Sequence, residues 1–136
     1  MGPRQGIFRI LTTILSVACF LGRSAAGDDL PLNANGWSVV TPSSDTRIYY
    51  VDATDGNDTT AQFIDASSVA DPRNPGPVNA YKTIEAAINA SRDGFPDWIL
   101  LKRGESWTVD SSWWQFRVGR SGTERFVLGY YGTSGA

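Results

Sequence analysis

Residues 79–107 constrain the fold more than any other stretch, because they join an amphipathic helix to an apolar strand. On a helical wheel one side is apolar and the opposite side is polar. The apolar side carries Ala80, Ile84, Ala87, Ile88 and Ser91, and the polar stripe carries Lys82, Glu85, Asn89 and Arg92. Asn79 is the expected N-cap, and Gly94 with Pro96 ends the helix. A helix this short is barely stable alone in water, and we therefore expect its apolar side to pack on another element.

The expected packing partner is the apolar run that follows this helix. Residues 98–101 are four consecutive apolar residues, which is typical of a strand buried on both faces. A helix followed closely by such a strand favours parallel pairing or a capped sheet edge. Residues 47–51 and 126–131 are also rich in aromatic and β-branched residues and are predicted to be strands. Residues 61–78 show no sustained period and are predicted to be a long irregular loop.

The N-terminus has the pattern of a secretory leader. Arg4 and Arg9 form a basic region, residues 10–21 form a mainly apolar run, and residues 24–26 are small. The run of 12 residues is shorter than the roughly 20 that a membrane-spanning helix needs. We therefore predict a signal peptide over 1–26, an extended arm over 27–46 and a folded domain over 47–136, in a secreted, extracellular or periplasmic protein. An uncleaved anchor and a lipid on Cys19 are the alternatives.

Composition excludes several classes of function. The chain has no histidine, and its single cysteine, Cys19, lies in the predicted leader, so His-dependent triads, imidazole zinc sites and structural disulfides are excluded. Of the 12 basic residues, Arg4, Arg9 and Arg23 would leave with the leader, which gives a net charge of −5 against 14 acidic residues. No basic patch is present, so nucleic acid and anionic membrane are not expected partners. Neutral glycans and cations fit this acidic, aromatic-rich composition.

The loop after the first predicted strand concentrates oxygen-bearing side chains. Asp52, Asp55, Asn57 and Asp58 lie within seven positions of one another. Carboxylate and amide oxygens are the ligands that calcium takes, so these four residues are candidate metal ligands and calcium is the candidate cofactor. The spacing differs from that of a helix-loop-helix calcium site, and tight turns use the same residue types. An ordinary turn is therefore the alternative interpretation.

Three segments together resemble a known family. Tyr49-Tyr50-Val51-Asp52 with Gly56-Asn57-Asp58, then residues 81–88, then residues 100–107, are similar to the opening of secreted right-handed parallel β-helix proteins of the pectate-lyase-like superfamily. Gly122-Thr123 with residues 127–133 is similar to the next coil. The resemblance implies a mostly β fold with an N-terminal cap helix over the first coils of a solenoid. Since solenoids need about three repeats, we expect the chain to be a fragment.

The resemblance also implies a role with polysaccharides, but it supplies no catalytic motif that these residues match. Asp97, Glu105 and Asp110 are carboxylates for which acid–base chemistry competes with a solvated turn role. Lys102 and Arg103 are candidate base or clamp residues of a lyase, with turn solubility as the alternative. Trp113 and Trp114 point to opposite faces if they lie on a strand, so one of them is a candidate for stacking on a sugar ring.

Three functions follow from these expectations. The first is the N-terminal part of a secreted polysaccharide lyase or glycoside hydrolase whose catalytic residues lie outside this chain. The second is a non-catalytic surface or adhesion protein that binds glycans. The third is a small secreted structural domain without a ligand.

Overall fold

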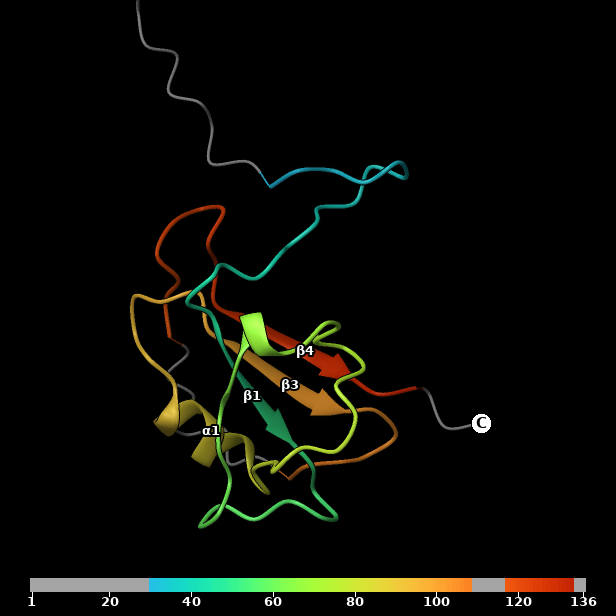
Figure 1. Ribbon diagram of the computed structural model, residues 1–136, viewed down its shortest axis with the longest axis vertical. Coiled ribbons are helices and arrows are strands. Elements are labelled where there is room, and N and C mark those ends of the chain that lie inside the picture. Colours follow the sequence, from blue (N-terminus) through green and yellow to red (C-terminus); the bar gives the residue numbers. More distant parts are fainter. Residues whose placement is uncertain (1–29, 109–116, 134–136) are drawn as a thin grey trace, which may run out of the picture.

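The computed structural model describes residues 30–108 and 117–133 as one small mixed sheet with one α-helix (Figure 1). The strands are β1 (Arg47–Val51), β2 (Ile64–Asp65), β3 (Trp98–Lys102) and β4 (Val127–Tyr131), in the order β2-β1-β3-β4. β1, β3 and β4 are parallel, and the short β2 pairs antiparallel with β1. The helix α1 spans Ile84–Ala90, and a single 3-10 turn, η1, spans Ala66–Ser68. The predicted leader lies outside the described residues, so it stays a prediction.

The central strands form where apolar residues are continuous in the sequence. Ile48, Tyr49, Tyr50 and Val51 of β1 are fully buried, as expected of parallel strands covered on both faces. The predicted strands at 47–51, 98–101 and 126–131 are confirmed, and so is parallel pairing. β2 and η1 were not predicted, since both lie within the segment read as an irregular loop.

Each face of the sheet carries its own apolar cluster. One face is covered by the segment between β2 and α1, and its cluster contains Ile48, Tyr50, Ala66, Ala80, Trp98, Leu100 and Tyr131. The other face is covered by α1, and its cluster contains Tyr49, Val51, Tyr81, Ile84, Ala87, Ile88 and Ile99. Burying an isoleucine such as Ile99 contributes roughly 1.5–3 kcal/mol. The sheet is therefore the middle layer between a helix and a long connecting segment.

The helix packs on the strand that the sequence predicted, but it begins later than expected. Thr83, not Asn79, is the N-cap, because its hydroxyl oxygen accepts a hydrogen bond from the backbone N–H of Ala86. Asp58 holds this end from outside the helix, accepting hydrogen bonds from the backbone N–H of Lys82 and Thr83. Tyr81 is extended and forms a parallel bridge with Val51. That bridge keeps residues 80–81 out of the helix.

The structure contradicts the predicted β-helix. The described residues form a single open sheet, one edge strand of which, β2, runs antiparallel to its neighbour. A solenoid coil instead passes through several separate sheets that stack around one interior. Here the two faces hold separate clusters, and the connection from β1 to β3 contains α1 (Figure 1). The three parallel strands were predicted correctly, but the solenoid arrangement was wrong.

Residues 30–46 lead into the sheet as an arm that reaches away from the strands (Figure 1). Near its start, Leu32 and Ser38 form an isolated bridge, and the side chains of Leu32 and Trp37 are exposed. Val40 packs against the apolar cluster on the face away from α1, and Thr46 is fully buried. The arm is thus anchored at its C-terminal end. None of the helices among the described residues has the length and apolarity to cross a membrane.

Candidate functional site

The three parallel strands end side by side, and this gathers polar residues at one edge of the sheet. Val51 pairs with Leu101, and Lys102 pairs with Tyr131, so Asp52, Lys102 and Tyr131 form a row across the three strand ends. Ligand sites of open sheets with parallel strands commonly lie at the carboxyl ends of those strands. This edge is therefore the candidate site.

The site is an ion-pair network around Lys102. The Nζ atom of Lys102 lies 2.6 Å from Oδ2 of Asp52, 3.4 Å from Oε1 of Glu105 and 3.7 Å from Oδ2 of Asp55. We call these four residues the carboxyl-end cluster. Because it contains one ammonium group and three carboxylates, the cluster has a net negative charge.

Backbone hydrogen bonds hold two of these carboxylates in place. Oδ1 of Asp52 accepts hydrogen bonds from the backbone N–H of Thr54 and Asp55, at 3.0 and 2.8 Å. Oε2 of Glu105 accepts one from the backbone N–H of Ala53 at 2.5 Å. The loop after β1 and the turn after β3 are thereby joined. Asp52 and Glu105 are therefore positioned by the backbone as well as by Lys102.

The charges of the cluster stabilise each other. Burial opposes ionisation of Asp52, but the backbone N–H of Asp55 and the Lys102 ammonium outweigh it and lower the pKa of the carboxyl group. The hydrogen bond to Asp52 raises the pKa of Lys102, and the nearby Glu105 carboxylate adds to this. Asp52 is therefore ionised and Lys102 protonated at neutral pH.

Part of the cluster faces solvent. The Asp55 side chain is 80% exposed and that of Lys102 is 36% exposed, whereas those of Asp52 and Glu105 are mostly buried. Tyr130 is also exposed, but it pairs with Leu101 and so lies on the α1 side of the sheet, opposite to Lys102, where the guanidinium carbons of Arg103 and Arg73 lie 3.6 and 5.0 Å from its ring centre. A ligand at these strand ends would meet Asp55 and Lys102 first.

The four predicted calcium ligands do not converge on one point. Asp52 is held by Lys102 and by its own turn, and Oδ1 of Asn57 accepts hydrogen bonds from the backbone N–H of Thr59 and Thr60. Asp58 caps α1, as described above. Such contacts are what an ordinary turn over residues 52–58 would make, which was the alternative to a calcium site. In the described ranges no group of three or more acidic or cysteine side chains could hold a metal ion, and the calcium site stays a prediction.

The candidate carboxylates at 97, 105 and 110 do not form one site. Glu105 belongs to the carboxyl-end cluster, Asp97 lies at the opposite end of the sheet, just before β3, and Asp110 lies outside the described residues. The stacking candidates Trp113 and Trp114 also lie outside the described residues. Lys102 is part of the site, whereas Arg103 lies against the ring of Tyr130 on the other face of the sheet.

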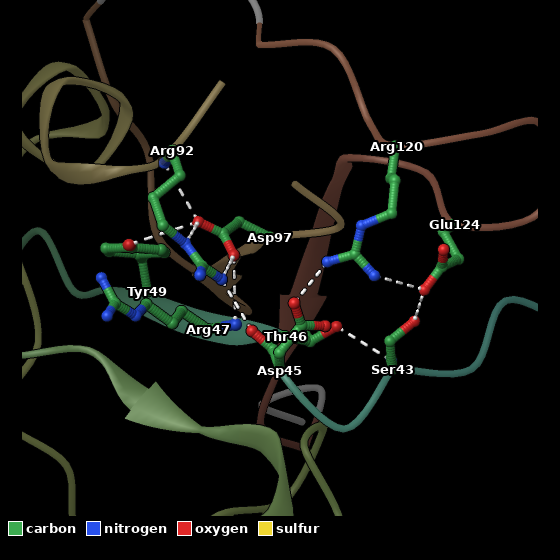
Figure 2. Close-up of polar contacts among 9 residues, drawn as sticks. All are labelled: Ser43, Asp45, Thr46, Arg47, Tyr49, Arg92, Asp97, Arg120 and Glu124. Atoms are coloured by element: carbon green, nitrogen blue, oxygen red, sulfur yellow. Dashed lines mark hydrogen bonds and ion pairs between the residues drawn. The ribbon is translucent and has the colours of Figure 1, made fainter. Parts of the chain in front are cut away.

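Asp97 is the centre of a structural network at the amino ends of the strands (Figure 2). Its buried carboxylate accepts hydrogen bonds from backbone or side-chain groups of Arg47, Tyr49 and Arg92. Arg92 also donates to the carbonyl oxygen of Asp45 at 2.6 Å. Beside it, Arg120 pairs with Asp45 and Glu124, and Ser43 donates to Glu124 (Figure 2). The network joins the arm, the end of α1, and residues 120–124, so its role is to hold these segments together.

Sequence reasoning did not find the pairing of Asp52 with Lys102. A signal was present, because each is the first charged residue after an apolar strand. Parallel pairing in register places such residues next to each other.

Comparisons with known proteins complete this description. No protein family, no curated protein and no solved structure matches this chain. The resemblance to the pectate-lyase-like superfamily therefore rests on the sequence motifs alone.

Proposed function

We propose that this chain is a secreted glycan-binding module that holds neutral polysaccharide at the carboxyl-end cluster. The observation that carries the proposal is an exposed carboxylate, Asp55, beside the partly exposed ammonium group of Lys102, which Asp52 and Glu105 hold in place. Secretion is the prediction from the leader pattern.

The chemistry of the cluster suits sugar hydroxyl groups. A hydroxyl donates to a carboxylate such as Asp55 and accepts from an ammonium such as Lys102. Since three carboxylates surround one lysine, the cluster repels other anions. Neutral polysaccharides are therefore favoured over those rich in uronic acids.

The protonation states favour binding over catalysis. A glycosidase needs a carboxyl group whose pKa is raised so that it can act as an acid, but the pKa of Asp52 is lowered. A basic lysine needs a lowered pKa, but the pKa of Lys102 is raised by its carboxylate partners. The role is compatible with the expectation that catalytic residues of a polysaccharide-active protein lie outside this chain.

The test is binding to a panel of neutral and acidic polysaccharides, measured by affinity electrophoresis and calorimetry. We expect at least one neutral glucan, xylan or mannan to bind, and alginate and polygalacturonate to bind more weakly. Asp55→Asn should weaken binding roughly tenfold, since it removes one charged hydrogen-bond acceptor. Asp65→Asn makes the same change at an exposed position of β2 and should leave binding unchanged.

Two results would contradict this function. One is the absence of binding to every polysaccharide tested. The other is equal binding by the wild type and Asp55→Asn, which would place the sugar elsewhere. Release of unsaturated or reducing ends by the wild type would show that the chain itself is catalytic.

A further inference from the structure

Two arginines meet on one exposed aromatic ring near the carboxyl end of β4. The guanidinium carbons of Arg103 and Arg73 lie 3.6 and 5.0 Å from the ring centre of Tyr130. Because Tyr130 pairs with Leu101, its ring lies on the α1 side of the sheet, opposite to Lys102. We call Arg73, Arg103 and Tyr130 the arginine–tyrosine site. It is separate from the carboxyl-end cluster.

Backbone hydrogen bonds bring these residues together from three segments of the chain. The N–H of Arg103 donates to the carbonyl oxygen of Tyr131 at 3.0 Å. The N–H of Gly132 donates to the carbonyl oxygen of Arg73 at 2.8 Å. Arg73 also lies in a tight turn, where its N–H donates to Oδ1 of Asp71 at 2.9 Å. The end of β4 therefore fixes the backbone from which both arginine side chains start.

Neither arginine has a counter-charge in the part of the chain that the structure describes. No carboxylate within residues 30–108 and 117–133 forms an ion pair with Arg73 or Arg103. The carboxylates nearest in sequence have other contacts, Asp71 in its own turn and Glu105 with Lys102. Two guanidinium groups at one ring repel each other, and nothing in these ranges offsets that repulsion.

Elsewhere the same chain balances such a pair of arginines with carboxylates. Arg92 and Arg120 also share one ring, with their guanidinium carbons 4.0 and 5.5 Å from the ring centre of Phe95. Both of these guanidinium groups are paired with carboxylates (Figure 2), namely those of Asp97, Asp45 and Glu124. At Tyr130 no carboxylate among the described residues takes the corresponding place. An anion from outside the chain would supply the same balance.

We propose that the arginine–tyrosine site binds a tetrahedral oxyanion, which is the phosphate or sulfate group of a small ligand. A guanidinium group stacked on an aromatic ring keeps its N–H donors free in its own plane, where they match an oxyanion. A phosphate or sulfate ester offers three free oxygens, whereas a carboxylate offers two. The tetrahedral group is therefore better suited to two guanidinium groups at once.

The small number of cations favours a small ligand over a nucleic acid or a membrane. Binding to those polyanions depends on many clustered lysines and arginines. This site has two, in a chain with 14 acidic and 12 basic residues, and the nearby carboxyl-end cluster has a net negative charge. A single charged group is what the site can neutralise.

The test is a titration of the protein, expressed from its full sequence, with inorganic phosphate and inorganic sulfate at constant ionic strength. Nuclear magnetic resonance follows the Nε–H of Arg103 and the ring of Tyr130. We expect both signals to shift and to saturate at millimolar anion. Acetate, a planar carboxylate with one oxygen fewer, should bind roughly tenfold more weakly.

Substitutions separate the guanidinium groups from their charge and from the ring. Arg103→Lys keeps the charge but loses the planar set of donors, so phosphate binding should weaken roughly tenfold. Tyr130→Leu removes the ring that orients both arginines and should also weaken binding, whereas Tyr130→Phe keeps the ring and should bind as the wild type does. Arg125→Lys is the matched control, because Arg125 is exposed and donates to Gly122 in its own loop.

Parallel titrations with a sugar phosphate and a sugar sulfate identify the source of the anion. Tighter binding of the esters would assign the site to a sugar ester, and equal binding would assign it to the free anion. The proposal is overturned if neither signal saturates, if acetate binds as tightly as phosphate, or if Arg103→Lys, shown to be folded by circular dichroism, keeps wild-type affinity. Since Asp55→Asn leaves this site intact, the result is independent of the glycan-binding test.

Discussion

Asp97 gathers five hydrogen bonds on a single carboxylate. It has no solvent exposure, yet its carboxylate is matched by a guanidinium, two backbone N–H groups and the hydroxyl of Tyr49 (Figure 2). Ionised groups are tolerated in a protein interior only when they are paired and hydrogen-bonded in this way. Asp97 therefore serves stability and not chemistry.

Replacing Asp97 with alanine should destabilise the protein by roughly 3 kcal/mol, the low end for breaking a buried ion pair. The low end applies because the Arg92 side chain is 23% exposed and can be hydrated. Urea unfolding followed by circular dichroism measures the change. Asp45→Ala removes a carboxylate from the exposed part of the same network and should have a much smaller effect. Equal losses in the two variants would contradict a structural role specific to Asp97.

At the scale of single elements, tertiary contacts decide which of two possible N-cap residues begins α1. Asn79 and Thr83 are both acceptable N-caps by residue type. Thr83 has the additional support of Asp58, whose Oδ2 accepts from the threonine hydroxyl at 2.9 Å, and residues 80–81 are already held by β1. The tertiary contacts decide where the helix begins.

Thr83→Ala should cost about 1 kcal/mol of stability, because it removes the cap of α1 and the partner of Asp58. Chemical unfolding measures the loss, and Thr83→Ser, which keeps the hydroxyl, should remain close to the wild type. Asn79→Ala should have no comparable effect. A loss at Asn79 as large as that at Thr83 would show that the cap is assigned to the wrong residue.

The elements were predictable where a local pattern is sufficient. Continuous apolar residues identified the three parallel strands, and a 3.6-residue period identified α1. β2 was missed because Ile64 and Asp65 form a strand only through their pairing with Ile48 and Arg47. The solenoid was wrong for a related reason, since strand and turn motifs do not state whether successive strands join one sheet or several. In the candidate site, Asp52 and Lys102 were both singled out, but for separate roles, because only the register of β1 on β3 joins them.

At the scale of the whole molecule, buried tyrosines link stability to alkaline pH. Burial, with a further contribution from Asp97, raises the pKa of Tyr49 to about 12. Burial, with the charge of Asp52, raises the pKa of Tyr131 to about 12 as well. The ordinary value of 10.0 applies to the unfolded chain. The folded state therefore prefers neutral tyrosine, and this preference is fully present below pH 10 and is lost as the pH rises towards 12.

We expect the protein to lose stability progressively above pH 10 and to unfold before its buried tyrosines titrate individually. Far-UV circular dichroism and tyrosinate absorbance, recorded together against pH, check this. Tyr49→Phe has one fewer titrating group and should show a shallower loss of stability with pH. Ordinary titration of every tyrosine near pH 10 in a protein that stays folded would contradict the prediction.

The distance in sequence between β1 and β3 also bears on synthesis. Asp52 and Lys102, at the ends of these strands, are 50 positions apart, so β1 has only the short β2 as a partner strand until the ribosome has added that many residues. At about 5–20 residues per second, the wait is several seconds. For that time the side of β1 that pairs with β3 stays open in the nascent chain, although all four of its buried residues are covered in the folded protein. That open side of β1 is a binding target for chaperones until β3 pairs with it.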